Sequence, residues 1–274
     1  MPRPLRLRRG ESVSDAFIIA TVPDALFEQR RLAQVYDPLD PDQSDLDVYV
    51  ALVEELGARS VLDVGCGTGT FACLLAAGGL QVTAVDPARA ALDVARSKPG
   101  ADRVRWLQGD ATALPALQVD LATMTGNVAQ VFLTDEEWAA TLVGVYGALR
   151  PGGRLIFETR DPDAQAWLQW SRESSRTHAA LSDGGSVESW VDVVDVRGPF
   201  VSFSTTFVFS SDGAVLTSGS TLRSRRRGEI EASLKSAGFD LTDMRAAPDR
   251  PGLELVFIAQ RPADSSARRV IGSL

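Results

Sequence analysis

Hydrophobic residues recur along the first part of this chain with two alternating spacings. Compact apolar runs of the kind found in buried strands occupy residues 60–64, 81–85, 104–108, 119–124 and 154–159. Between them, apolar residues three or four positions apart predict helices at 46–56, 70–77, 88–97 and 142–149. This regular alternation predicts an α/β fold built on a doubly wound sheet.

The rhythm changes after residue 160. Three segments, 186–196, 200–210 and 214–223, alternate apolar and polar residues around glycine-containing turns, which predicts three antiparallel strands. A helical pattern returns at 228–237 and an apolar strand at 253–259. Ahead of the core, apolar spacing predicts a helix over 23–36 that breaks at Tyr36 and the prolines after it.

Composition and charge narrow the classes of function. The 274 residues carry a net charge of -8, so we expect no nucleic acid partner. No stretch approaches the roughly 20 apolar residues of a membrane helix, and acidic residues interrupt the short apolar run after the N-terminal arginines, so we expect a cytoplasmic protein without membrane contact. Cys66 and Cys73 match neither a disulfide framework nor a zinc spacing, so no metal is expected.

The most informative stretch joins the first strand to the next helix. Asp63 ends an apolar run, and Gly65, Gly67 and Gly69 alternate before the helix begins. Glycines permit positive φ and close approach of a ligand, while the helix start offers unpaired N–H groups. The spacing differs from the Gly-x-Gly-x-x-Gly of dinucleotide dehydrogenases, and a carboxylate before the turn suits a ligand that carries an amine.

This stretch, with Cys66 inside the turn, resembles motif I of the class I S-adenosylmethionine-dependent methyltransferases. The resemblance covers about residues 45–160 and implies that the turn wraps the amino-acid part of the cofactor. It also implies a Rossmann-like seven-stranded sheet with an antiparallel last strand, and a small antiparallel β insertion after strand five. The expected units are 1–45 as an N-terminal arm and helix over the site, 46–160 as the cofactor core, 161–227 as the insertion, and 228–274 as the end of the core and a tail.

Further cofactor contacts are predicted at the ends of the following strands. Asp86 stands about 20 residues beyond the turn, where a carboxylate can accept from both ribose hydroxyls; capping of the helix that begins at Pro87 is a compatible second role. The resemblance implies that Asp110, between Gly109 and Ala111, accepts from the adenine amino group, with capping as its alternative. The segment after strand four borders cofactor and acceptor, which predicts contacts at Thr125, Asn127 and Gln130 unless they cap the next helix.

Candidate acceptor and catalytic residues come from several places. Tyr36 is predicted either to approach the transfer centre or to pack its helix on the core, and Arg160 lies at the end of strand five. Glu158, an acid of the insertion such as Glu188, or His178 could take a proton from the acceptor. Arg223 and Arg225, with Arg226 and Arg227, could hold an anionic acceptor such as a carboxylate or phosphate, although a solvated basic face is the alternative. The inserted strands resemble the roof over the acceptor in small-molecule N-methyltransferases.

The predicted function is therefore transfer of a methyl group from S-adenosyl-L-methionine to a nitrogen or oxygen of a small molecule, leaving S-adenosyl-L-homocysteine, by a monomer or homodimer. Two alternatives stay open: a non-catalytic cofactor-binding or regulatory protein, and a nicotinamide-dependent oxidoreductase. The second is disfavoured because Lys98 and Lys235 are the only lysines and no Tyr-Lys constellation is evident.

Overall fold

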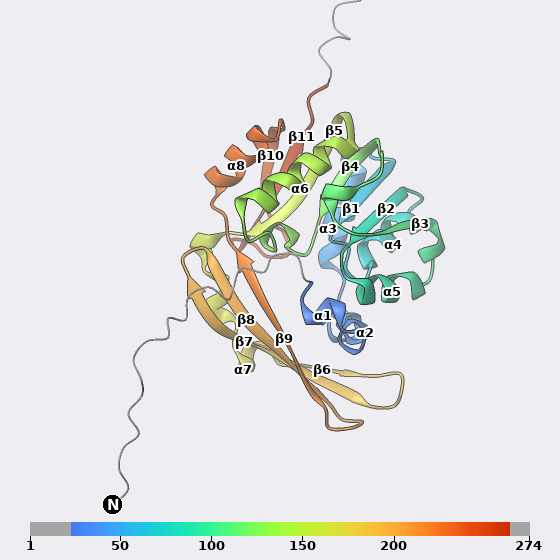
Figure 1. Ribbon diagram of the computed structural model, residues 1–274, viewed down its shortest axis with the longest axis vertical. Coiled ribbons are helices and arrows are strands. Elements are labelled where there is room, and N and C mark those ends of the chain that lie inside the picture. The colour runs from blue at the N-terminus through green and yellow to red at the C-terminus, as the bar shows by residue number, and fades with distance from the viewer. Residues whose placement is uncertain (1–22, 264–274) are drawn as a thin grey trace, which may run out of the picture.

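A seven-stranded sheet forms the centre of the protein in a computed structural model that describes residues 23–263 (Figure 1). The strand order is β10-β11-β5-β4-β1-β2-β3. Its strands are β1 (Ser60–Val64), β2 (Gln81–Asp86), β3 (Val104–Gln108), β4 (Val119–Met124), β5 (Leu149–Arg160), β10 (Asp240–Ala246) and β11 (Glu254–Gln260). The five adjacent strands β5, β4, β1, β2 and β3 are parallel to one another, while β11 is antiparallel to both of its neighbours, β5 and β10. The predicted doubly wound, seven-stranded sheet with an antiparallel last strand is confirmed.

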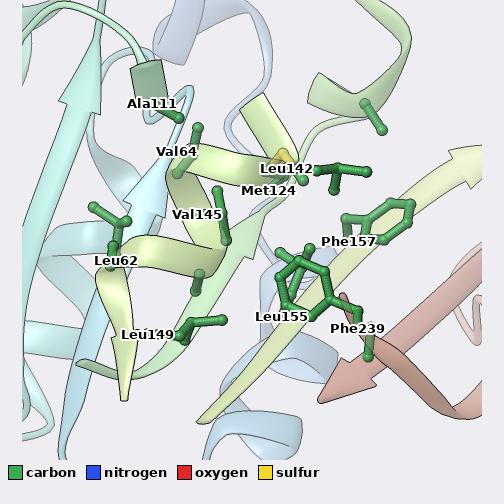
Figure 2. Packing of buried hydrophobic residues seen from close by; sticks show 14 of the residues in the cluster. Leu62, Val64, Ala111, Met124, Leu142, Val145, Leu149, Leu155, Phe157 and Phe239 are labelled. Carbon is green, nitrogen blue, oxygen red and sulfur yellow. The ribbon is translucent and has the colours of Figure 1, made fainter. Parts of the chain in front are cut away.

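Helices cover both faces of this sheet because successive residues of its strands point to opposite sides. Leu62 and Phe157 pack with helix α6 on one face (Figure 2), whereas Val61 and Ile156 pack with helices α3 and α4 on the other. The helices of the core are α3 (Asp45–Glu55), α4 (Thr70–Ala77), α5 (Arg89–Ser97), α6 (Asp135–Ala148) and α8 (Arg227–Ser236). Short 3-10 turns are η1 (Ala101–Arg103), η2 (Ala111–Ala113), η3 (Val128–Gln130), η4 (Pro162–Ala164) and η5 (Ala166–Gln169).

The insertion forms a separate antiparallel sheet between β5 and α8 (Figure 1). It contains β6 (Thr177–Ala180), β7 (Ser186–Arg197), β8 (Phe200–Phe209) and β9 (Val215–Arg223) in that order, preceded by the short helix α7 (Arg172–Ser175). The prediction of three strands was one short. Strand β6 escapes the pattern analysis because its four residues, Thr-His-Ala-Ala, show no clear apolar alternation.

The N-terminal helical segment differs from its prediction. It consists of two helices, α1 (Ala25–Glu28) and α2 (Arg30–Leu39), separated by the extended residue Gln29. The expected break at Tyr36 is wrong, because α2 continues to Leu39 and contains Pro38, which costs the helix one backbone hydrogen bond but lies only one residue before its end. Within the described part of the chain, no helix combines the length and apolarity needed to cross a bilayer.

Candidate active site

The glycine turn joins β1 to α4 and adopts a backbone that other residues resist. Gly65, Gly67 and Gly69 have φ values of +72°, +53° and +77°. A Cβ atom on Gly65 would lie 2.6 Å from Val128, and one on Gly69 would lie 2.4 Å from the Trp106 ring. The turn is therefore tightly packed on its flanks, and its path requires glycine at these positions.

Asp63 lies directly beneath this turn and is 1% exposed. Its Oδ1 accepts a hydrogen bond from the Thr123 hydroxyl at 3.0 Å, whereas its Oδ2 is buried without a hydrogen-bond partner among the described residues. Burial raises the pKa of Asp63 to about 7, although the Thr123 hydrogen bond lowers it. Burial also raises the pKa of the Cys66 thiol inside the turn. An unpaired buried carboxylate oxygen favours a ligand that donates hydrogen bonds.

Asp86 connects the turn to the end of β2. Its Oδ2 accepts from the Gly67 N–H and its Oδ1 from the Ala88 N–H, each at 2.8 Å. Burial raises the pKa of Asp86, and these two N–H groups oppose the rise. The carboxylate thus stands at the start of α5, just before the exposed Pro87, while each oxygen retains a further lone pair for a ligand hydroxyl.

The end of β3 lies beside the end of β2, where the Gly109 N–H donates to the Asp86 carbonyl at 3.0 Å. Asp110 follows with an exposed side chain, and its Oδ1 accepts from the Thr112 N–H at 2.8 Å, so it caps the 3-10 turn η2. Ala111 is buried. The capping role is observed; the adenine role stays a prediction.

Asn127 is the central residue of the segment after β4. It adopts a left-handed backbone with φ of 62°, which is uncommon outside glycine. Its N–H donates to Glu158 Oε1 at 2.8 Å, and its side-chain amide donates to Glu254 Oε1 at 3.0 Å. Thr125, earlier in the segment, is half-buried. Two buried carboxylates therefore hold Asn127, Glu158 of β5 through its backbone and Glu254 of β11 through its side chain.

Glu158 lies below Asn127 and is 2% exposed. Its Oε2 is buried without a hydrogen-bond partner among the described residues. Burial raises the pKa of Glu158 to about 7; the Asn127 N–H and the nearby Tyr49 hydroxyl lower it, and Glu254 raises it. The side chain is thus a buried carboxyl able to change protonation near neutral pH, and half of its acceptor capacity is already used.

Gln130 and Arg160 extend this network toward the inserted sheet. Arg160 donates from Nη1 to Gln130 Oε1 at 3.0 Å and forms a 3.5 Å ion pair with Glu254. Gln130 in turn donates to the Ser224 hydroxyl at 3.2 Å, and the Arg160 guanidinium lies 5.0 Å from the Trp170 ring centre. Burial lowers the pKa of Arg160. Gln130 and Arg160, which the sequence analysis named separately on the segment after β4 and at the end of β5, are therefore in direct contact.

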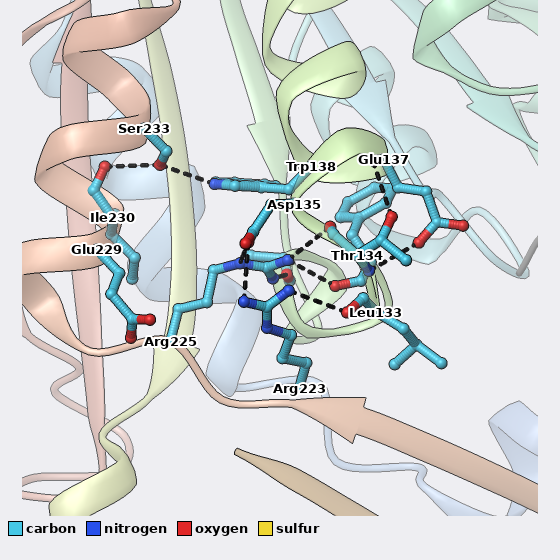
Figure 3. A network of polar contacts seen from close by, with 12 residues as sticks. Leu133, Thr134, Asp135, Glu137, Trp138, Arg223, Arg225, Glu229, Ile230 and Ser233 are labelled. Carbon is cyan, nitrogen blue, oxygen red and sulfur yellow. Dashed lines mark hydrogen bonds and ion pairs between the residues drawn. The ribbon is translucent and has the colours of Figure 1, made fainter. Parts of the chain in front are cut away.

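Arg223 and Arg225 lie in a different network, around the start of α6 (Figure 3). Arg223 donates to the Leu133 carbonyl at 3.0 Å and pairs with Asp135 at 2.8 Å. Arg225, predicted together with Arg223 either to hold an anionic acceptor or to lie on a solvated basic face, is 4% exposed and donates to the carbonyls of Phe132 and Thr134 at 2.8 and 2.9 Å, so the solvated face is wrong for this residue. Burial lowers the pKa of Arg225 to about 10. These guanidinium groups hold the segment before α6 and are engaged with protein atoms.

Tyr36 lies on α2 with its ring centre 5.2 Å from that of Phe27. Burial raises its pKa to about 12. Phe27 in turn lies 3.8 Å from where a Cβ atom of Gly67 would stand, so the Phe27 ring lies against the turn. The observed aromatic contact of Tyr36 is with Phe27 of helix α1; packing of Tyr36 on the core and its contact with an acceptor both stay predictions.

His178 is exposed on β6, opposite Glu188 of β7, and Glu188 forms an ion pair with Arg176. Neither His178 nor Glu188 joins the hydrogen-bond networks around Asp63, Asp86 and Glu158 in the described residues. Across residues 23–263 no group of three or more His, Cys, Asp or Glu side chains is arranged to hold a metal ion.

Glu254 is the functional candidate that the sequence did not reveal. It starts β11 and is 3% exposed, yet it contacts Asn127, Arg160 and Arg250. Asn127 precedes it by 127 residues, so no local spacing indicates the contact. The signal available was an acid at the start of an otherwise apolar strand, opposite Arg160 in the antiparallel pair.

Comparison with known proteins finds similarity over part of the chain. Residues 61–153 match the model of a methyltransferase domain family. The chain is 36% identical over 118 residues to the cypemycin N-terminal methyltransferase of a Streptomyces species, covering 43% of this chain and 48% of that protein. It is 30% identical over 152 residues to a malonyl-[acyl-carrier protein] O-methyltransferase of Pseudescherichia vulneris, covering 54% and 59%. The chain thus spans about half the length of these curated relatives.

A solved structure resembles nearly the whole chain. The sugar N-methyltransferase KedS8 from Streptoalloteichus sp ATCC 53650 superposes with a TM-score of 0.67 at 17% identity, covering 92% of this chain and 99% of that one. At that identity the likeness concerns the fold.

Proposed function

We propose that this chain, which carries a methyltransferase domain of the class I S-adenosylmethionine-dependent family, transfers a methyl group from S-adenosyl-L-methionine to a nitrogen or oxygen of a small molecule. The observation that supports this most strongly is the glycine turn between two buried acids, Asp63 beneath it and Asp86 beside it. The ends of three neighbouring parallel strands meet at this point, as at the ligand crevice of open α/β sheets.

The residues present fit the cofactor. Asp63 offers an unpaired buried oxygen to a donor such as an α-ammonium group, and Asp86 retains lone pairs for two ribose hydroxyls. Gly67 leaves the most room in the turn for close approach, because only Phe27, at 3.8 Å, lies within 4 Å of its Cβ position. When bound, S-adenosyl-L-methionine supplies a sulfonium-activated methyl group to in-line attack by the acceptor, which leaves S-adenosyl-L-homocysteine.

The adenine is assigned to the end of β3. Gly109, Asp110 and Ala111 lie beside Asp86 through the Gly109 N–H hydrogen bond. One oxygen of Asp110 caps Thr112, and its exposed carboxylate leaves acceptor capacity for an exocyclic amino group.

The acceptor is assigned to the junction of the core and the inserted sheet near Asn127, where Arg160 contacts Gln130 and Trp170, and Trp170 contacts Phe203 of β8. These side chains would orient the acceptor, since holding the attacking atom in line is the main contribution a protein makes to transfer of an activated group. Glu158 is a better candidate than His178 for receiving a proton, because it lies at the end of β5 next to Asn127 while His178 is exposed on β6.

The function is tested by incubating the protein with methyl-labelled S-adenosyl-L-methionine and a panel of amino sugars, other amines, phenols and carboxylates, with detection of labelled product and S-adenosyl-L-homocysteine by mass spectrometry. We expect acceptor-dependent formation of both. Replacement His178→Asn should leave the rate unchanged, and Glu158→Gln should lower the rate while retaining cofactor affinity. Formation of S-adenosyl-L-homocysteine at the same rate with and without every acceptor would contradict the proposal.

A further inference from the structure

Helices α1 and α2, residues 25–39, form a helical cover between the core and the inserted sheet (Figure 1). Toward the inserted sheet the cover is apolar. Leu32 and Val35 share a buried cluster with Val187, Phe207 and Phe209, and no described member of that cluster belongs to the core sheet. Arg31 adds an ion pair with Asp212 at 2.8 Å.

Toward the core, the cover makes polar contacts with the glycine turn. Asp37 Oδ1 accepts from the Thr68 hydroxyl at 2.7 Å and from the Thr70 hydroxyl at 3.3 Å, and its Oδ2 pairs with Lys98 Nζ at 2.8 Å. Lys98 also donates to Thr70. Asp37 thus joins the turn, the first residue of α4 and the end of α5 through one carboxylate.

The charge of Asp37 matters because Lys98 brings an ammonium group to the N-terminal end of α4, which is the positive end of the helix dipole. The Asp37 carboxylate offsets both. A second, weaker contact supports the same side of the cover, since Glu28 accepts from the Arg89 N–H at 3.0 Å.

We propose that Asp37 is a positioning residue that holds the cover against the glycine turn and so controls release of the cofactor. When the cover opens, it separates from the turn and stays with the inserted sheet. This inference rests on the proposed function, because the ligand it retains is the cofactor of that site.

The two interfaces of the cover differ in how readily they open. Separation from the inserted sheet would expose Leu32, Val35, Phe207 and Phe209 to water. Separation from the turn breaks hydrogen bonds and one ion pair whose side chains are 19% and 23% exposed, and water replaces those contacts. The polar interface is therefore the one that opens. Phe27, 3.8 Å from the Cβ position of Gly67, is one apolar contact that opening removes.

The test measures release of S-adenosyl-L-homocysteine by stopped-flow displacement from the full-length protein. Asp37→Asn should accelerate release by about tenfold, the effect of one charge-assisted hydrogen bond, with the thermal midpoint nearly unchanged. Lys98→Met should accelerate release as well, and the double variant should show less than the product of the two effects because the residues are partners. Asp47→Asn, an exposed carboxylate on α3, is the matched control and should leave release unchanged.

Salt and hydrogen exchange separate this role from a purely structural one. Release from the parent should accelerate with salt, which screens the Asp37–Lys98 pair, whereas release from Asp37→Asn should not. In that variant, Thr68 to Thr70 should lose amide protection while β8 keeps it. A release rate within twofold of the parent, or loss of protection in β8 and α2 together, would overturn the proposal. Failure of the parent to bind S-adenosyl-L-homocysteine would instead refute the proposed function.

Discussion

Replacing Asp86 by asparagine should weaken both the fold and cofactor binding, for reasons that the geometry makes explicit. The two carboxylate oxygens accept separate backbone hydrogen bonds, from Gly67 and from Ala88, each at 2.8 Å. An asparagine side chain has one oxygen, so its NH2 group would face one of those N–H donors. A buried donor without an acceptor costs about 1–3 kcal/mol. For a chain of this length, 2 kcal/mol corresponds to a fall of about 4–8 °C in the thermal midpoint.

The effect on binding is separate from the effect on stability. Loss of one charge-assisted hydrogen bond to a ribose hydroxyl costs about 1.5–3 kcal/mol, or roughly 10- to 150-fold in the dissociation constant. Calorimetric titration with S-adenosyl-L-homocysteine measures the binding term, and thermal unfolding without ligand measures the stability term. Asp93→Asn is the control, because Asp93 is 59% exposed and pairs only with Arg96 among the described residues. An Asp86→Asn variant that binds within threefold of the parent would refute the reasoning.

The remaining predictions concern the buried acid, the turn and the arginine network. Burial raises the pKa of Asp63 to about 7, against an ordinary value near 3.9. As pH rises from 4 to 7, the free energy of unfolding of the parent should therefore fall by about 2–4 kcal/mol relative to that of Asp63→Asn. Denaturant unfolding at a series of pH values measures this difference, and a difference that stays constant with pH would contradict the burial argument. Gly69→Ala should lower the free energy of unfolding by at least about 1–3 kcal/mol, because its Cβ atom would lie 2.4 Å from Trp106. Gly79→Ala, at a φ of +90° with open space around it, should lose only the free energy of the backbone strain. Equal losses in denaturant unfolding would show that packing around Gly69 does not limit stability. Arg225→Met should lower the free energy of unfolding by about 3–5 kcal/mol, because it leaves buried carbonyl groups unpaired. Arg226→Met changes an exposed residue and should lower it by less than about 0.5 kcal/mol. Similar losses for the two variants would contradict the structural role assigned to Arg225.

The centre of the core sheet was predictable because β1, β2 and β4 are buried on both faces and read as continuous apolar runs, and because the glycine turn after β1 has a distinctive local sequence. The ends of β1 and β2 follow from that order, which is why Asp63 and Asp86 could be proposed as cofactor contacts from their positions in the sequence, whereas the role of Asp110 came from the family resemblance. Strand β6 was missed because four residues carry too little pattern.

Other features depend on contacts between distant segments. Glu254 meets Asn127 across the sheet, and Arg225 reaches the segment before α6 from the far end of the insertion. Asp37 appeared only as part of a helix break, yet the fold places it on Thr68. A pattern analysis detects which face of an element is apolar; it does not detect which polar groups the packing then brings together.

Binding of the cofactor tests the central claim most directly. The purified full-length protein, shown by mass spectrometry to be free of co-purified ligand, would be titrated calorimetrically with S-adenosyl-L-methionine, S-adenosyl-L-homocysteine and NAD. The account predicts one equivalent of each sulfur compound bound with a dissociation constant on the order of 10 μM, and no binding of NAD. Absence of heat with both sulfur compounds in verified ligand-free protein would contradict it.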